Sequence, residues 1–172
     1  MKARGVGLTP EDRKRQGLVL PFSVQDNLTL ACMNRTSVQG VLRKQREREL
    51  AREMVDSLGI KTPSLGVLTG TLSGGNQQKV VVGNWLNTLP GVLLMDEPTR
   101  GIDIQAKEQI FSLVRDLARR GIAVLFISSE VEEVLDVSDR ILIMNRGRIT
   151  GEVMRDAVNV EKLLEMVMEE IE

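Results

Sequence analysis

Two adjacent carboxylates, Asp96 and Glu97, follow an apolar run that extends from Val92 to Met95. Four consecutive apolar residues predict a strand that is buried on both faces of an α/β sheet. Open α/β sheets bind their ligands at the carboxyl ends of their strands, which is where this pair lies. There, an aspartate can hold Mg²⁺ and a neighbouring glutamate can polarise an attacking water. Taken alone, the pair is equally consistent with carboxylates that cap the next element.

A second candidate site is the segment LSGGNQQK, residues 72–79, in which a serine and two glycines precede a predicted helix from Asn76 to Leu86. The first N–H groups of a helix have no partner inside it, and glycines leave them unshielded. Such a helix start binds anions. The alternative is a plain glycine-rich helix cap.

Composition narrows the kind of protein in which these groups can act. With 172 residues, 42% hydrophobic and 27% charged, the chain suits one globular domain. A net charge of -1 and an aromatic content of 2% give no reason to expect a nucleic-acid partner. There is no histidine, the commonest general base, and the single cysteine, Cys32, suits a reducing compartment. Without a membrane-length apolar run or a signal peptide, the chain is predicted to be cytoplasmic.

Hydrophobic periodicity and turn residues predict the elements that position the two candidate sites. Prolines at positions 10 and 21 restrict the first part to short strands and loops. A helix is expected from Val38 to Leu58, with Gly59 as its stop. Asp103 is expected to cap a long amphipathic helix that ends at Gly121. The remaining elements are a buried strand in IAVLFIS, a short helix in SEVEEVL, a hairpin that turns at residues 145–147, and a helix over residues 159–172.

The order of these elements predicts an α/β fold with a mostly parallel sheet, because strands alternate with helices from residue 91 onward. Residues 22–89 are predicted to be mainly helical, so the chain would form a helical lobe and a core lobe of one domain.

The two candidate sites occur in order with a third motif, RGID, directly after the segment DEPT. Together they resemble the ATPase family of ABC transporters, whose signature motif reads LSGGQ, whose Walker B strand ends in Asp-Glu-Pro, and whose D-loop follows. Asn76 replaces the last residue of that signature. With TPEDRKRQGLVLPFSVQDNL and ISSEVEEVLDVSDRILIM, the chain is similar from about Gly5 to Glu152 to the second nucleotide-binding half of bacterial ribose, galactose and xylose importer ATPases.

The resemblance implies the later part of a P-loop NTPase core with a helical subdomain. Residues 1–21 would form the Q-loop region of the core lobe, and residues 22–89 the helical lobe with the signature motif. Residues 90–172 would form the core lobe with Walker B, the D-loop and a degenerate switch loop. The Walker A loop is expected upstream of residue 1, because the sequence contains no Gly-Lys dipeptide.

The resemblance also implies a role for each site residue. In the family, two nucleotide-binding domains face each other, and the signature of one contacts the ATP that the other binds. The signature residues that would contact ATP in this way are Ser73, Gly74, Gly75, Asn76 and Gln77. In the chain's own half-site, Asp96 would hold Mg²⁺ indirectly and Glu97 would polarise water. Asp103 would belong to the D-loop. Glu11 would take the Q-loop glutamine position, and Ser129 would take the switch-histidine position.

The partners implied are a second nucleotide-binding domain, a transmembrane permease and, indirectly, a sugar-binding protein outside the cytoplasm. ATP and Mg²⁺ would act in the complete assembly, at the inner face of the membrane, with none expected on the chain alone. Arg13, Lys14 and Arg15 are expected either to contact the permease or to be solvated. Self-association of the chain is also expected, because the strands at 92–95 and 122–127 would lack neighbours. The sugar is not specified, because specificity in such importers lies in the binding protein and the permease.

Two alternatives stay open. One is a non-transport ABC ATPase of DNA repair or translation, although the repair enzymes insert long coiled coils and no sustained heptad pattern occurs here. The other is a non-catalytic remnant or a regulatory fragment.

We predict that the chain alone does not hydrolyse ATP, because it lacks the Gly-Lys loop whose backbone N–H groups and lysine hold the phosphates. Phosphate release from the purified chain measures this. Magnesium-dependent turnover that disappears in the Glu97→Gln variant would contradict the prediction.

Overall fold

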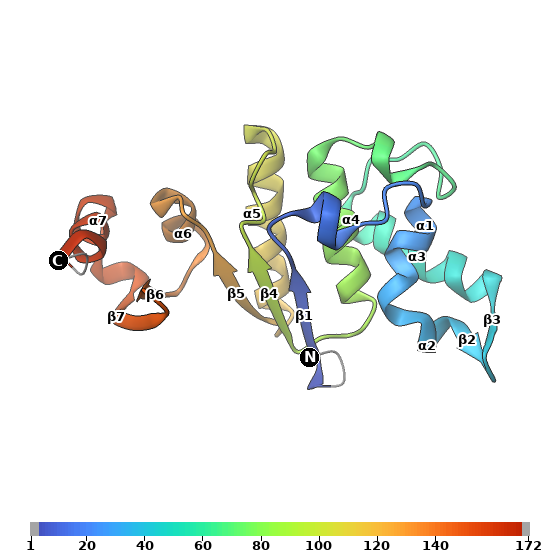
Figure 1. The fold of residues 1–172 in the computed structure, drawn as a ribbon, viewed down its shortest axis with the longest axis horizontal. Helices are drawn as coiled ribbons and strands as arrows, with labels where there is room; N and C mark the ends of the chain where they lie inside the picture. The colour runs from blue at the N-terminus through green and yellow to red at the C-terminus, as the bar shows by residue number, and fades with distance from the viewer. Residues whose placement is uncertain (1–3, 170–172) are drawn as a thin grey trace. The chain divides into compact units, whose positions relative to one another are not determined.

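A three-stranded sheet in the order β1-β4-β5 carries the strand ends on which the candidate site is built (Figure 1). Strand β1 (Val6–Thr9) pairs in parallel with β4 (Val92–Asp96), and the register places Thr9 beside Met95. Strand β4 is joined to β5 (Ala123–Ile127) through the long helix α5 (Ile104–Arg119). The predicted α/β order and the parallel pairing are therefore confirmed at the strand that ends in Asp96.

The computed structural model describes residues 4–169. The chain divides within β5 into two compact units, Met1–Leu125 and Phe126–Glu172, and each is described by itself. Among the described residues, no helix combines the length and the apolar character that crossing a membrane requires.

In the three-stranded sheet, β4 and β5 are less buried than the sequence predicted, because their faces are not both covered. On β4, Leu93 and Met95 are completely buried, but Val92 and Leu94 are only partly so. On β5 the prediction of a buried strand is wrong, because Leu125 and Ile127 are 47% and 46% exposed. Alternate residues of a strand point to opposite faces, so one face of β5 presents apolar side chains to solvent. The expected self-association of the chain stays a prediction.

Three helices of the first unit enclose a shared core. They are α1 (Val24–Thr29), α3 (Lys44–Leu58) and α4 (Gly74–Leu86), and the short helix α2 (Met33–Thr36) follows α1. The fully or almost fully buried residues of this core are Leu18, Val24, Leu28, Ala51, Leu58, Ile60, Val80 and Val81. Helix α4 also packs on β1 and on α5. It therefore connects the helical part of the unit to its sheet.

The predicted helix from Val38 to Leu58 is correct only for its later part. Residues 37–42 instead form a hairpin in which β2 (Ser37–Val38) pairs antiparallel with β3 (Val41–Leu42). Gln39 and Gly40 have φ values of 52° and 79°, the left-handed pair that a two-residue hairpin turn requires. Helix α3 begins only at Lys44, and Gly59 ends it in the left-handed conformation, as expected.

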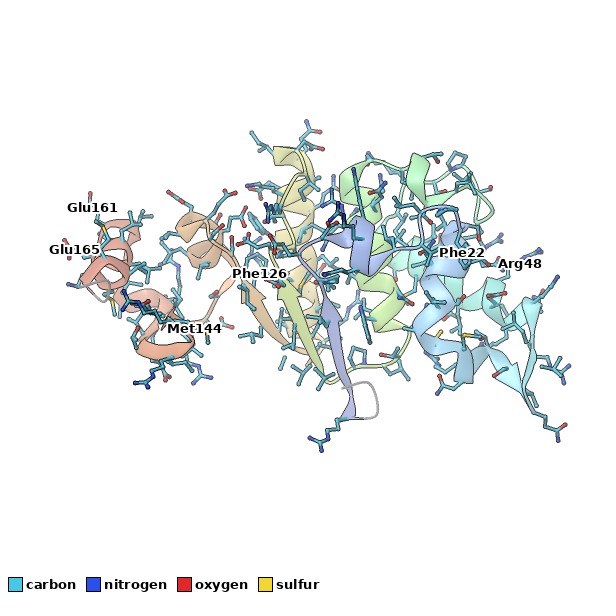
Figure 2. The ribbon with its side chains drawn as sticks, in the orientation of Figure 1. Phe22, Arg48, Phe126, Met144, Glu161 and Glu165 are labelled. Atoms are coloured by element: carbon cyan, nitrogen blue, oxygen red, sulfur yellow. The ribbon has the colours of Figure 1, made fainter. Side chains whose placement is uncertain are left out.

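The second unit consists of α6 (Val131–Val137), the hairpin of β6 (Arg140–Asn145) and β7 (Arg148–Met154), and α7 (Val160–Glu169). Its core residues are Leu135, Ile141, Ile143, Val158 and Leu163. The predicted hairpin is confirmed, with Arg146 and Gly147 as its left-handed turn. The predicted last helix is confirmed as far as Glu169, and residues 170–172 lie outside the described part. Figure 2 shows Met144 on the hairpin and Glu161 and Glu165 on α7, all of them exposed.

Lys79 is a buried cation in the middle of α4. Its side chain is 7% exposed, and its Nζ donates a hydrogen bond of 3.2 Å to the carbonyl of Gly59 at the end of α3. Burial lowers the pKa of Lys79 from its ordinary 10.5, and the neighbouring charge of Lys61 lowers it further. The contact between α3 and α4 therefore includes a charge in an unfavourable environment.

We predict that Lys79 makes the stability of the chain rise with pH. In the window from the lowered folded pKa up to 10.5, the unfolded chain binds more protons at this side chain than the folded chain does. The free energy of unfolding should therefore increase across that window and level off above it. Urea unfolding at several alkaline pH values measures this, and the Lys79→Met variant should lack this contribution. Lys44→Met, an exposed position on α3, controls for the loss of one positive charge.

Candidate functional site

The carboxyl ends of β1 and β4 bring three of the expected site residues to one edge of the sheet. The parallel register carries β1 to Thr9 beside Met95, so Glu11 follows one strand end while Asp96 and Glu97 follow the other. Thr9 is completely buried, and its Oγ1 donates a hydrogen bond of 3.5 Å to the carbonyl of Leu94. The pairing thus places Glu11 and the two carboxylates at a common edge, as α/β sheets do for their ligands.

Glu97 has a backbone conformation that the sequence does not reveal. Its φ is 43°, in the left-handed region that non-glycine residues seldom adopt. The conformation starts a tight turn, in which the N–H of Arg100 donates to the carbonyl of Glu97 at 3.1 Å. Thr99, inside this turn, is 2% exposed. Such strain persists where the surrounding structure imposes it, and functional sites are common places for it.

Asp103 ends this loop and begins α5. Its side chain accepts a hydrogen bond of 2.9 Å from the N–H of Ala106, so the predicted helix cap is confirmed. The D-loop role of Asp103 stays a prediction.

The first turn of α4 has the features expected of an anion site. Ser73 is the exposed residue before the helix, and none of the described side chains caps its free N–H groups. Asn76, which replaces the usual signature residue, donates from its Nδ2 to Ser73 Oγ at 2.9 Å. Its Oδ1 accepts from the N–H of Lys61 at 2.8 Å. Asn76 therefore holds the serine hydroxyl in place and ties it to the loop after α3.

Gly74 and Gly75 are glycines because their neighbours leave no room for a side chain. A Cβ on Gly75 would lie 2.6 Å from the Cβ of Ala106 on α5, and a Cβ on Gly74 would lie 3.3 Å from the carbonyl oxygen of Gly101. The first turns of α4 and α5 and the loop after Glu97 are therefore packed directly against each other. Two helix N-termini lie together, which concentrates their positive dipole ends.

Gln77 turns away from this helix start. It is 4% exposed, and its Nε2 donates to the carbonyls of Thr69 and Leu72 at 3.3 and 3.1 Å. The structure thus places Gln77 beneath the loop that leads into Ser73, where it holds the backbone of that loop.

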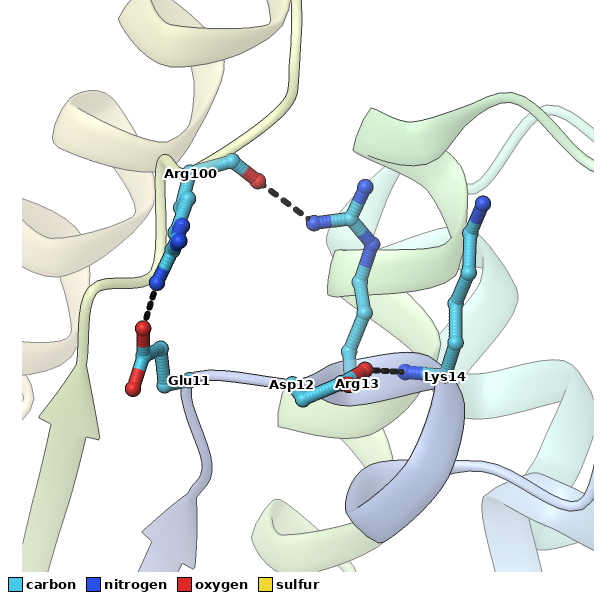
Figure 3. Close-up of a pocket in the computed structure, with 5 residues that line it drawn as sticks. All are labelled: Glu11, Asp12, Arg13, Lys14 and Arg100. Carbon is cyan, nitrogen blue, oxygen red and sulfur yellow. Dashed lines mark hydrogen bonds and ion pairs between the residues drawn. The ribbon is translucent and has the colours of Figure 1, made fainter.

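Arg13 is a residue of this site that the sequence interpretation missed. Both readings of the basic turn 13–15, permease contact or solvation, placed its side chain outside the fold, but Arg13 is only 8% exposed. Its guanidinium donates to the carbonyl of Arg100 at 2.7 Å (Figure 3). It also donates to the carbonyl of Gly101 at 3.2 Å. Burial lowers the pKa of Arg13, and Asp12 opposes that shift. No local pattern distinguishes this arginine from its neighbours, because its partners are backbone carbonyls far along the chain.

Glu11, at the expected Q-loop position, forms an ion pair with Arg100 (Figure 3). The two side chains line a hollow together with Asp12, Arg13 and Lys14. Both members of the pair are at least 47% exposed, so their attraction is screened by water. The pair ties the loop after β1 to the loop after β4.

Ser129, at the expected switch position, belongs to the second unit and follows β5. The adjacent Ser128 donates from its hydroxyl to Glu133 Oε2 at 2.8 Å, and its Oγ accepts from the N–H of Glu130 at 3.1 Å. These bonds anchor the loop that carries Ser129 to the start of α6.

The carboxylates at the end of β4 suit Mg²⁺ better than a metal ion that takes all of its ligands from the protein. Within residues 4–169, no three histidine, cysteine, aspartate or glutamate side chains gather into a metal-binding group. Asp96 and Glu97 offer oxygen ligands only, and Mg²⁺ takes one or two carboxylates while it keeps waters and substrate phosphates. The two carboxylates could therefore hold Mg²⁺, which would keep waters or phosphate oxygens as its other ligands.

Comparison with known proteins identifies a family of similar sequences. A protein-family model described as ABC transporter matches residues 3–100. The ribose import ATP-binding protein of Oceanobacillus iheyensis is 45% identical over 164 residues, which cover 95% of this chain and 33% of that protein. The xylose import ATP-binding protein of Moorella thermoacetica is 49% identical over 162 residues, covering 94% and 32%. The chain thus spans about a third of the length of the curated relatives it matches.

A solved structure of a metal-chelate type ABC transporter in an inward-facing conformation is similar in fold. Its TM-score is 0.80 at 19% identity, and the match covers 96% of this chain and 64% of that one. At this identity the likeness shows the fold alone, and it confirms the predicted α/β ATPase fold.

The strain at Glu97 is testable with a pair of variants. We expect Glu97→Gly to be more stable than Glu97→Val by about 1 kcal/mol, because glycine adopts a positive φ freely and a β-branched residue does not. Both variants lose the carboxylate, so their difference reports on the backbone. Urea unfolding measures it, and a valine variant as stable as the glycine variant would contradict the strain.

Proposed function

The chain belongs to the ABC transporter family, and we propose that it is part of an ATPase that powers the import of a simple sugar. The names of the relatives, ribose and xylose import ATP-binding proteins, support this substrate class. The longest described helix has 16 residues, which does not favour the coiled-coil repair enzymes. We propose further that the chain acts at the inner face of the membrane, with a permease and a second nucleotide-binding domain.

The uncapped first turn of α4 is the observation that carries this proposal. Ser73 would bind the γ-phosphate of an ATP that a partner domain holds, with its hydroxyl and with the N–H groups of Gly74 and Gly75. The tight packing of these glycines against α5 and the loop after Glu97 supports the role, because it holds the N–H groups rigidly. Rigid donors stabilise developing charge without reorganisation.

The chain's own strand end would supply the carboxylates of a second ATP site. Asp96 would hold Mg²⁺ indirectly, and the ion would neutralise phosphate charge when the nucleotide is bound. Glu97 would orient and polarise the attacking water from the end of β4. The Walker A loop of that site would come from sequence outside residues 1–172, since these residues contain no Gly-Lys dipeptide.

The roles proposed for the other expected positions are those of the matching family positions. Glu11 would take the Q-loop position, where its carboxylate pairs with Arg100. Ser129 would contact the γ-phosphate through its hydroxyl, and it cannot take up a proton as the family's histidine does. Asp103 would belong to the D-loop and Gln77 would support the signature from beneath. The helical lobe of residues 22–89 would dock the permease.

The experiment uses a hybrid ATPase in which this chain replaces the aligned third of the Moorella thermoacetica xylose import relative. The place that Ser73, Gly74 and Gly75 would offer to the γ-phosphate is called the phosphate seat. We expect the hybrid to hydrolyse ATP and the Ser73→Arg variant to lose at least about tenfold in kcat, because the longer side chain fills this seat in place of the serine hydroxyl. Phosphate release at saturating ATP measures this. Ser57→Arg, on the exposed face of α3, is the matched control and should keep the turnover of the hybrid.

Turnover of the Ser73→Arg hybrid within twofold of the unsubstituted hybrid would overturn the signature role. A hybrid that folds but has no ATP turnover would overturn the proposal as a whole.

A further inference from the structure

Arg13 joins three segments of the first unit that are distant in sequence. The side chain starts in the loop after β1, and its Nη1 donates to the carbonyl of Arg100 (Figure 3). Its Nη2 donates to the carbonyl of Gly101. On its other side, Nη2 lies against the start of α4, where a Cβ on Gly74 would come within 2.8 Å of it. The guanidinium therefore fills the space between the loop after Glu97 and the helix start that carries Ser73.

The partners of Arg13 are unusual for a buried cation. Among the described residues, no acidic side chain forms an ion pair with Arg13, since Glu11 pairs with Arg100 and Asp12 pairs with Arg15. Asp12 acts on Arg13 only through its nearby charge. Arg13 Nε is buried and has no hydrogen-bond partner among the described residues. Withdrawing a charge from water without a carboxylate partner is costly. An apolar residue of similar length would avoid that cost, so stability alone does not explain an arginine here.

Only a guanidinium suits this position geometrically. Its planar fork presents several N–H donors at fixed angles, and it bridges two successive backbone carbonyls with separate nitrogens. A lysine ammonium is a single point that reaches one carbonyl at good geometry. The arrangement thus fixes the distance between the loop 100–101 and the first turn of α4.

We infer that Arg13 is a positioning residue that sets the geometry of the phosphate seat at Ser73 by bracing the loop after Glu97 against the start of α4. The inference rests on the proposed function of that seat. Arg13 would contact neither nucleotide nor metal. It acts through the backbone of Arg100, Gly101 and Gly74.

Hydrogen exchange in the chain itself tests the brace without any nucleotide. We expect Arg13→Met to speed exchange about tenfold or more at the amides of Arg100, Ile102 and Gln77, because the loss of two charge-assisted hydrogen bonds frees both segments. Their acceptors are the carbonyls of Glu97, Thr99 and Ser73. The Ile60 amide, which bonds to Val55 at the end of α3, should be unaffected.

Two further variants keep the test decisive if Arg13→Met folds poorly. Arg13→Lys keeps the charge and should restore only part of the protection of these amides from exchange. Full protection would show that the two-pronged guanidinium is not required, and it would overturn the inference. Arg119→Met, an exposed arginine near the end of α5, is the matched control. Unchanged exchange at all three amides in Arg13→Met would overturn the inference.

Gly74→Ala tests the same contact from the other side. The added methyl group meets Nη2 of Arg13, so the disturbance at the Gln77 amide should be smaller when Arg13→Ala is also present. An equal disturbance in both backgrounds would overturn the contact between the two residues.

The hybrid ATPase separates this inference from the proposed function. We expect Arg13→Met to lower kcat about tenfold with KM for ATP little changed, because the nucleotide is bound by the partner motifs and only the geometry of the seat is altered. Normal kcat with faster exchange would overturn the positioning role but leave the proposed function standing. If Ser73→Arg has no effect on the hybrid, the proposed function fails whatever Arg13 does.

Discussion

The parallel pairing of β1 with β4 is the interaction on which the rest of the site depends. It joins residues that are more than eighty positions apart, with Thr9 beside Met95. Because the two strands run in the same direction, the loops that follow them leave the sheet at the same edge. Glu11 can therefore pair with Arg100, and Arg13 can reach the carbonyls of Arg100 and Gly101. Without this pairing, Glu11 at the expected Q-loop position would not be held at the same sheet edge as Asp96 and Glu97.

The glycines at the start of α4 satisfy two demands at once. Gly74 and Gly75 are required by packing, because Arg13, Gly101 and Ala106 occupy the space of any side chain. In the proposed function, the same absence of side chains would let a phosphate approach the N–H groups of the first turn. The packing role of these glycines and their proposed role in binding phosphate are therefore compatible. Close packing on one side makes the turn rigid, and a rigid turn is what a phosphate seat needs.

Three residues of the first unit have an unfavourable conformation or environment. Glu97 has a positive φ, the pKa of Arg13 is lowered by burial, and the pKa of Lys79 in α4 is lowered for the same reason. The apolar core of α1, α3 and α4 and the helix cap at Asp103 stabilise the unit in which these residues lie. Strain of this kind is common where a site must hold a geometry that local preferences would not choose.

Several features were predictable from the sequence because they depend on near neighbours. A few adjacent residues decide each of four features. These are the helix cap at Asp103, the helix end at Gly59, the strand that ends in Asp96, and the turn at Arg146 and Gly147. The order of the motifs LSGGNQQK, DEPT and RGID also identified the family, because it combines three independent signals. Hydrophobic periodicity failed at residues 38–42, where the left-handed pair Gln39 and Gly40 favours a hairpin over a helix.

By itself, then, the sequence determined most of the elements, the family and most of the candidate site residues. Only the tertiary structure decided that Arg13 is buried between two loops, that Glu11 faces Arg100, and that Gln77 turns inward. It also decided that one face of β5 stays exposed. The positions of Arg13 and Glu11 depend on contacts between segments distant along the chain, and the exposure of β5 depends on which segments cover it. Gln77 bonds to carbonyls 5 and 8 residues away, but a hydrophobic pattern does not specify which partner a polar side chain takes.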